Sequence, residues 1–112
     1  MEVKPFATFD DFLKLDMRVG TILAAELVPE SKKLVKLAVD FGAEQRQVVA
    51  GIAKEYPDPA VLIQKQAIFL MNLEPRKLAG LESQAMLLVA ATDEAAVILQ
   101  PSAAMPNGST IQ

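Results

Sequence analysis

The chain of 112 residues contains no cysteine, no histidine and no tryptophan. Without cysteine there is no disulfide, thiolate metal site or cysteine nucleophile, a composition typical of a reducing compartment. Without histidine there is no general base of the usual kind, no serine–histidine hydrolase arrangement and no imidazole metal ligand. The five glycines are scattered singly, so no Gly-rich phosphate loop is present. We therefore expect a non-enzymatic binding module with no catalytic residue, no metal site and no cofactor.

Long apolar runs are also absent from the sequence. No stretch of about 18 uncharged apolar residues occurs, which argues against a membrane span. The start, Met1–Pro5, lacks the apolar run of a signal peptide. We therefore expect a cytoplasmic protein. With 52% hydrophobic residues, a chain of this length can bury its core as one domain over residues 1–112.

Positive charge is unevenly spread along a chain whose net charge is −3. Arg76 and Lys77 form the last basic pair, because no Lys or Arg follows Lys77. Four more cations lie close together earlier, at Lys32, Lys33, Lys36 and Arg46. An acidic chain is repelled by nucleic acid unless its cations gather at one place, since contacts from Lys and Arg to phosphate supply most of the affinity.

Hydrophobic periodicity predicts mostly strands. Thr8 followed by Asp11 resembles a capping box, so we expect a short helix after an extended lead-in over residues 1–8. Its apolar face, with Phe9 and Phe12, should pack on the domain core or on another subunit. We expect five strands, over residues 17–28, 35–41, 46–52, 67–73 and 85–90. A brief helix should follow Asp58, between the third and fourth strands.

Three strands, a short helix and two strands are the element order of the OB-fold, a Greek-key barrel whose face and loops often bind oligonucleotides. We therefore predict an all-β, five-stranded OB-fold barrel with short helices, among them the N-terminal helix. Residues 91–112 form a C-terminal extension with a short strand over 97–99 and a turn-rich tail. The lead-in over residues 1–8 would equally suit the end of a linker.

The basic pair is predicted to lie in the loop between the last two strands, at the edge of the barrel's binding face. Arg76 can fork onto one phosphate, whereas Lys77 acts as a flexible point charge. Pro75 stiffens the chain before them and Gly80 lets it turn back. An ordinary solvated loop fits the same charge pattern, and that alternative stays open.

Further candidate contacts flank this loop. Asn72 and Ser83 bracket it and are candidates to hydrogen-bond phosphate, ribose hydroxyl or a base edge, or else are simple turn residues. The Met86 thioether could pack on an exposed base. Lys32 and Lys33, at the start of the second strand, are weaker candidates because basic residues there are usually solvated.

The aromatic residues indicate a binding mode. Single-strand binders stack bases on aromatic rings, but this chain has five Phe and one Tyr. Of these, Phe9, Phe12, Phe41 and Phe69 are expected to pack within the fold. This favours an RNA recognised by its folded shape and backbone over one read base by base.

Several ordered motifs resemble the tRNA-binding domain at the C-terminus of many methionyl-tRNA synthetases and in free-standing proteins of the same type. They are Asp16–Gly20, Lys33–Gly42, Arg46–Ile52, Asn72–Lys77 and Ser83–Met86. The resemblance implies an OB-fold that binds tRNA by shape, and a homodimer built partly from the N-terminal helix and C-terminal extension. It also implies a synthetase catalytic domain as a further partner. Binding in that family is attributed to positions matching Lys33, Asn72, Arg76, Ser83 and Met86.

A second resemblance is to the CsaA-type proteins, small dimeric OB-fold proteins linked to secretion and described as chaperone-like. It is carried by Phe9–Asp16 and Pro106–Gly108. The alternative function is therefore a chaperone or protein-interaction dimer that offers an apolar groove to unfolded segments. In that case the basic loop would matter little.

Overall fold

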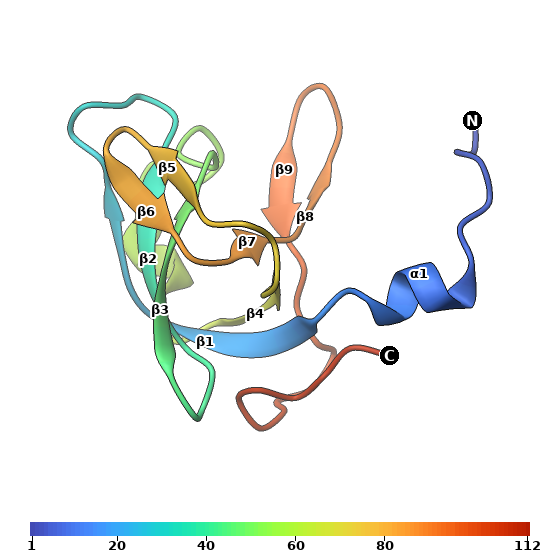
Figure 1. Cartoon of the computed structure of the whole chain (residues 1–112). Coiled ribbons are helices and arrows are strands. Elements are labelled where there is room, and N and C mark those ends of the chain that lie inside the picture. Colours follow the sequence, from blue (N-terminus) through green and yellow to red (C-terminus); the bar gives the residue numbers. More distant parts are fainter.

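A computed structural model describes all residues from Met1 to Gln112, and its framework is the 11-residue strand β1 (Met17–Leu27) (Figure 1). The first half of β1 pairs with β4 (Gln66–Leu70), and the second half pairs with β2 (Val35–Asp40), both antiparallel. A register shift between Ile22 and Ala24 marks a β-bulge. A bulge bends the strand, so the two halves of β1 can pair with different partners. With β3 (Gln45–Ala50) and β7 (Met86–Leu87), the strand order is β3-β2-β1-β4-β7.

The core follows from the alternation of side chains along β2. Val35, Leu37 and Val39 are buried, while the residues between them are only partly covered, as a half-buried strand requires. Phe69 of β4 meets Phe41 edge to face, with ring centroids 5.3 Å apart. The predicted second strand and the packing of these two rings are therefore confirmed.

Main-chain and side-chain hydrogen bonds close the sheet between β3 and the segment just before β7. The Gln84 N–H donates to the Gln47 carbonyl at 2.9 Å, and the Gln47 N–H donates to Gln84 Oε1 at 2.8 Å. Further along β3, the Val49 N–H donates to Ser83 Oγ at 3.0 Å. The result is a five-stranded, nearly closed antiparallel barrel of the OB type, which confirms the predicted fold.

Two short helices accompany the barrel. The 3-10 helix η1 (Pro59–Leu62) has Asp58 as its N-cap, as predicted, with Oδ1 accepting from the Ala60 N–H. The α-helix α1 (Phe9–Leu13) begins with the expected capping box, in which Thr8 and Asp11 exchange two bonds of 3.0 Å. Neither helix has the length or apolar character needed to cross a membrane.

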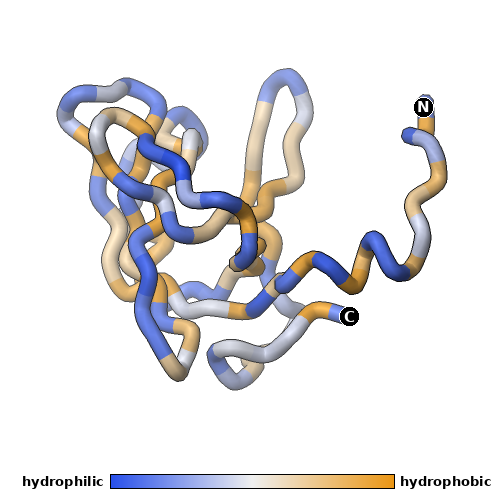
Figure 2. The backbone as a smooth tube through the Cα atoms, viewed as in Figure 1, coloured by the Kyte–Doolittle hydropathy of each residue, from blue (hydrophilic) through white to orange (hydrophobic).

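Helix α1 stands away from the barrel, and hydrophobic residues alternate with hydrophilic ones along it (Figures 1 and 2). None of its residues is buried, and Phe9 is 72% exposed. Phe9 instead stacks against Phe12, with ring centroids 6.3 Å apart. Packing of Phe9 on the domain's own core is therefore ruled out, because the helix points away from the barrel at the N-terminal end of β1.

The segment predicted as a basic loop forms a hairpin. The fourth strand ends at Leu70, and β5 (Arg76–Leu78) pairs with β6 (Leu81–Ser83). The two linking residues, Ala79 and Gly80, have φ of 50° and 78°, as in the type I′ turn whose twist suits paired strands. Arg76 and Lys77 are thus held on a strand, and Gly80 makes the predicted turn.

The last quarter of the chain leaves the barrel and then returns to it. The predicted fifth strand divides into β7 and β8 (Val89–Ala91), because β8 pairs with β9 (Ala96–Ile98) in a separate ribbon. The tail then lies along the first half of β1. There the Gly108 N–H donates to the Val19 carbonyl at 2.8 Å, and the Ile111 N–H donates to the Met17 carbonyl at 2.9 Å.

Candidate nucleic-acid interface

The 11 cations of the chain divide into two groups by whether they form an ion pair. Four are paired with a carboxylate, and these are Lys14, Arg18, Lys36 and Arg46. The other seven have no carboxylate within 4.0 Å, and these are Lys4, Lys32, Lys33, Lys54, Lys65, Arg76 and Lys77. A cation already matched by a carboxylate offers less to phosphate, so the unpaired group contains the stronger candidates.

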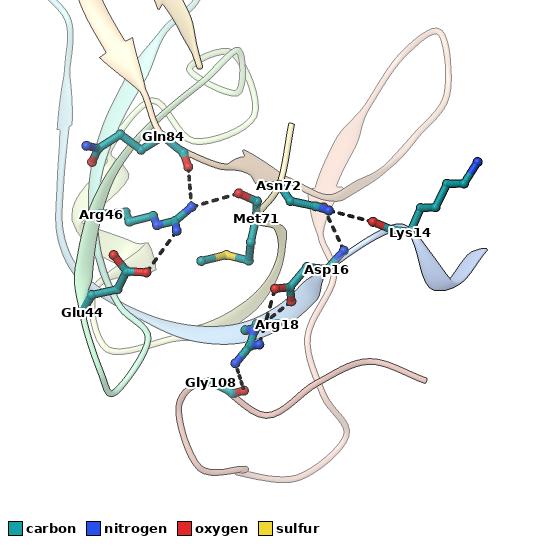
Figure 3. A network of polar contacts seen from close by, with 9 residues as sticks. All are labelled: Lys14, Asp16, Arg18, Glu44, Arg46, Met71, Asn72, Gln84 and Gly108. Atoms are coloured by element: carbon teal, nitrogen blue, oxygen red, sulfur yellow. Dashed lines mark hydrogen bonds and ion pairs between the residues drawn. The ribbon is translucent and has the colours of Figure 1, made fainter. Parts of the chain in front are cut away.

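Arg46 belongs to the framework of the barrel. Its Nη1 donates to the carbonyls of Met71 and Gln84, each at 2.9 Å, and its Nη2 donates to Glu44 at 3.0 Å (Figure 3). The guanidinium thus joins β3 to the chain after β4 and to the chain after β6. Lys36 is likewise engaged, with Nζ 2.7 Å from Oε1 of Glu26.

Arg18 also serves the fold. Its guanidinium donates to both carboxylate oxygens of Asp16 and, at 3.4 Å, to the Gly108 carbonyl of the tail (Figure 3). The hydrogen bond to Asp16, reinforced by the charge of that carboxylate, raises the pKa of Arg18 above its ordinary value. The side chain ties the tail to β1.

A cleft of about 250 Å³ lies between the end of β3, the β5–β6 hairpin, β7 and the β8–β9 ribbon. Its lining is mostly apolar, and Arg76 is the only cation that lines it. Met86 and Leu73, which line the same cleft, are 49% and 48% exposed. No aromatic ring lines it. The cleft therefore joins an accessible apolar surface to an unpaired guanidinium.

The loop that carries Lys32 and Lys33 lies at the same end of the barrel. The Lys33 carbonyl accepts from the Ala53 N–H at 3.1 Å, two residues beyond Gly51, which lines the cleft. A second cavity is lined jointly by residues of this loop and of the hairpin. The fold thus gathers both basic segments that the sequence separates by some 40 residues.

Lys54 was missed by sequence reasoning. It follows Ala53 directly, so the hydrogen bond between Ala53 and Lys33 brings Lys54 beside the loop before β2. Lys54 is exposed. Nothing local singles it out, because its closeness to Lys33 depends on how β2, β3 and the segment after β3 pack. No group of three or more acidic side chains is placed to hold a metal ion.

Asn72 precedes the hairpin and Ser83 is the last residue of β6, and the polar side-chain atoms of both have partners within the chain. Asn72 Nδ2 donates to the Lys14 carbonyl at 2.7 Å, and its Oδ1 accepts from the Asp16 N–H at 2.8 Å (Figure 3). Ser83 is 8% exposed, and its Oγ accepts from the Val49 N–H and donates to the Ala85 carbonyl. Contact of either side chain with RNA stays a prediction.

Comparison with known proteins gives consistent matches. The family model described as "Putative tRNA binding domain" matches residues 17–110. Methionine–tRNA ligase of Methanococcus aeolicus is 54% identical over 102 residues, which cover 91% of this chain and 15% of the ligase. This chain therefore spans only about 15% of the length of that relative.

Two crystal structures resemble the whole chain. The MetRS related protein from Pyrococcus horikoshii is 39% identical with a TM-score of 0.91, over 97% of this chain and 100% of that one. Chaperone CsaA from Bacillus anthracis is 36% identical with a TM-score of 0.87, over 96% of this chain and 100% of that one. The family model, the sequence relatives and the barrel geometry agree, and the chain belongs to the tRNA-binding domain family.

Proposed function

We propose that the chain is a non-catalytic module that binds the backbone of folded tRNA, either as a free-standing protein or as part of a methionyl-tRNA synthetase. The observation that carries this proposal is the sorting of the cations. Arg18 and Arg46 bond to carbonyls of distant segments and support the fold. Of the seven unpaired cations, all but Lys4 and Lys65 are carried by the hairpin, by the loop before β2 and by the segment after β3, which lie at one end of the barrel. Such a module would act in the cytoplasm by raising the local concentration of tRNA at a synthetase.

Recognition by shape is supported by the positions of the aromatic rings. Phe41 and Phe69 are buried against each other, and the Tyr56 hydroxyl accepts from the Ile98 N–H at 3.2 Å. No aromatic ring lines the cleft beside Arg76. A cleft without stacking rings favours reading an RNA mainly through its phosphates and overall form.

The proposal is tested by filter binding of purified protein to total tRNA and to an unstructured RNA of equal length, at two salt concentrations. We expect saturable binding that prefers tRNA and weakens with salt. Arg76→Ala with Lys77→Ala should reduce tRNA affinity at least tenfold at low salt. It should also flatten the dependence of log affinity on log salt by roughly 0.7–0.9 for each phosphate that the variant no longer neutralises.

A matched pair of single variants separates unpaired from paired cations. Lys54→Ala should weaken tRNA binding severalfold, whereas Lys36→Ala removes a lysine already matched by Glu26 and should leave the affinity nearly unchanged. Equal losses in the two variants would mean that only net charge matters. Full tRNA affinity in the Arg76/Lys77 double variant would refute the proposal.

We also propose a homodimer in which α1 and the C-terminal extension take part. Phe9 and Leu13 on α1 are 72% and 60% exposed, and Val97 on β9 is 51% exposed. Apolar side chains gathered on a helix that touches no core of its own are typical of an interface.

The second candidate function is a CsaA-like chaperone or protein-interaction dimer. It is favoured by the mostly apolar cleft and by the likeness to the chaperone CsaA structure. Light-scattering assays of a denatured client protein would test it. Suppression of aggregation that survives the Arg76/Lys77 double substitution, together with no preference for tRNA, would move this candidate to first place.

A further inference from the structure

The apolar cleft beside Arg76 has room for a small planar ligand. Its volume is about 250 Å³, and an apolar cavity of about 150 Å³ is enough to hold benzene. One purine base would therefore fit. The accessible side chains of Leu73 and Met86 offer it apolar contact on the lining.

Gly51 supplies the second observation. Its backbone does not have the positive φ that only glycine adopts easily, and a Cβ placed there would meet nothing nearer than the Lys33 carbonyl oxygen, 4.0 Å away. Neither conformation nor packing within the chain therefore requires glycine. Close approach of a ligand to the backbone is one reason for a glycine at such a place.

The main-chain groups of Gly51 are also free. Its N–H and its carbonyl take part in none of the hydrogen bonds within the chain, although Ile52 and Ala53 beside it are both bonded through their N–H groups. Gly51 is exposed and lines the cleft. A donor and an acceptor on one residue match the paired acceptor and donor on the edge of a nucleobase.

The cleft is lined by one cation and one carboxylate, Arg76 and Glu74, and the cation is the group that can bind the phosphate of such a nucleotide. Arg76 lines the cleft and has no carboxylate partner. On the other side, Lys33 is joined through its carbonyl to Ala53, two residues beyond Gly51. A nucleotide seated with its base in the cleft would therefore have the Arg76 guanidinium available to its phosphate, with the loop of Lys33 next to the Gly51 side of the cleft.

We infer that the cleft is a binding site for one unstacked nucleobase, held between the Met86 thioether and the open backbone of Gly51, with its phosphate on Arg76. The inference rests on the proposed function and adds to it a single base contact within shape-directed binding. The contact uses a polarisable methionine and a peptide edge in place of an aromatic ring.

The direct test uses adenosine 5′-monophosphate and ribose 5-phosphate as probes of the full chain, with methyl-labelled methionine and amide NMR. Met105 is an internal control, because it is 47% exposed, close to the 49% of Met86, and does not line the cleft. We expect the nucleotide to shift the Met86 methyl and the Gly51 amide saturably while the Met105 methyl stays in place. Ribose 5-phosphate should shift neither Met86 nor Gly51.

Two substitutions that change the cleft in opposite directions complete the test. Gly51→Val fills the site and Met86→Ala removes its apolar contact, so each should weaken nucleotide and tRNA binding roughly fivefold to tenfold. Met105→Ala is the matched control and should change neither affinity. Thermal unfolding checks that the Gly51 variant folds, and the Met86 variant decides the question if it does not.

Several results would overturn the inference. One is that the nucleotide causes no saturable shift of the Met86 methyl and Gly51 amide signals. The others are that ribose 5-phosphate causes the same shifts, or that only an apolar peptide causes them. If the Arg76/Lys77 double variant loses tRNA binding while both cleft variants keep it, the base site is wrong and the proposed function stands. If the double variant keeps tRNA binding, the proposed function fails first.

Discussion

Ser83 shows how a residue chosen from sequence for binding can have a structural role. Its buried hydroxyl satisfies the Val49 N–H at 3.0 Å and donates to the Ala85 carbonyl at 2.9 Å. Val49 is itself 5% exposed, so its N–H would be poorly solvated once the hydroxyl is removed. An unsatisfied buried donor costs about 1–3 kcal/mol.

Ser83→Ala should therefore lower the free energy of unfolding by about 1–3 kcal/mol, measured by urea denaturation without RNA. The exposed Ser102→Ala is a matched control and should leave the urea midpoint unchanged. An unchanged midpoint for Ser83→Ala together with weaker tRNA binding would instead make Ser83 a direct RNA contact.

Sequence reasoning located the cations correctly in the chain but could not assign their partners. The guanidinium of Arg46 donates to carbonyls 25 and 38 residues away, contacts that exist only after the barrel closes. Lys54 has no local signal at all and becomes a candidate only through the hydrogen bond between Ala53 and Lys33. Residue types are readable from sequence, whereas their pairing is a property of the closed barrel.

At the scale of elements, α1 depends on a charged cap. The Thr8 N–H donates to Asp11 Oδ2 at 3.0 Å, and this bond, reinforced by the Thr8 hydroxyl, lowers the pKa of the Asp11 carboxyl below its ordinary value. A depressed folded-state pKa means that the carboxylate stabilises the helix above its ordinary titration range. That contribution is lost as pH falls through the lowered pKa.

We therefore expect α1 to fray on acidification below the ordinary carboxyl range, about pH 4, while the barrel stays folded. Amide NMR signals of residues 8–13 would report the fraying separately from those of β1 and β4. Asp11→Asn should make this change independent of pH. Loss of helix and barrel signals together would show that acid acts on the whole fold.

The β5–β6 hairpin carries acidic residues as well as basic ones. Lys77 lies opposite Glu82 in the cross-strand register, and Glu74 lines the cleft with Arg76. These carboxylates offset the two cations, so the positive charge offered to phosphate at this end depends also on the lysines of the neighbouring segments.

Glu82→Gln should raise tRNA affinity about twofold to fivefold at low salt, because it removes a carboxylate facing Lys77, and the gain should shrink as salt rises. Filter binding at two ionic strengths measures both effects. Glu2→Gln in the lead-in makes the same charge change far from the hairpin and is the control. A similar gain from both variants would assign the effect to net charge.

Strands were predictable where the period of two runs long enough. Six alternating residues identify β2, whereas β5 and β6 have three residues each and β7 has two, too few for a periodic signal. The hairpin was therefore predicted as a loop, although its turn at Gly80 was recognised. Its strands form because each pairs with the other across a tight turn, which hydrophobicity alone does not encode.

At the scale of the whole molecule, the proposed homodimer predicts a measurable mass. Sedimentation equilibrium should give twice the mass of 12.1 kDa. Phe9→Ser with Leu13→Ser should shift the protein toward the monomer without lowering the melting temperature of the barrel. Val61→Ser, a change at an exposed apolar residue of η1, is the control and should leave the mass unchanged. A monomeric unmodified protein would contradict the proposed dimer.

The pairing of the tail with β1 has a consequence for synthesis on the ribosome. The first half of β1 is bonded on one side to β4 and on the other to residues 108–111, which are translated some 90 residues later. A nascent chain therefore holds one edge of β1 unpaired until residues 108–111 have left the exit tunnel. During that interval the open edge of the barrel is exposed to strand exchange with neighbouring nascent chains.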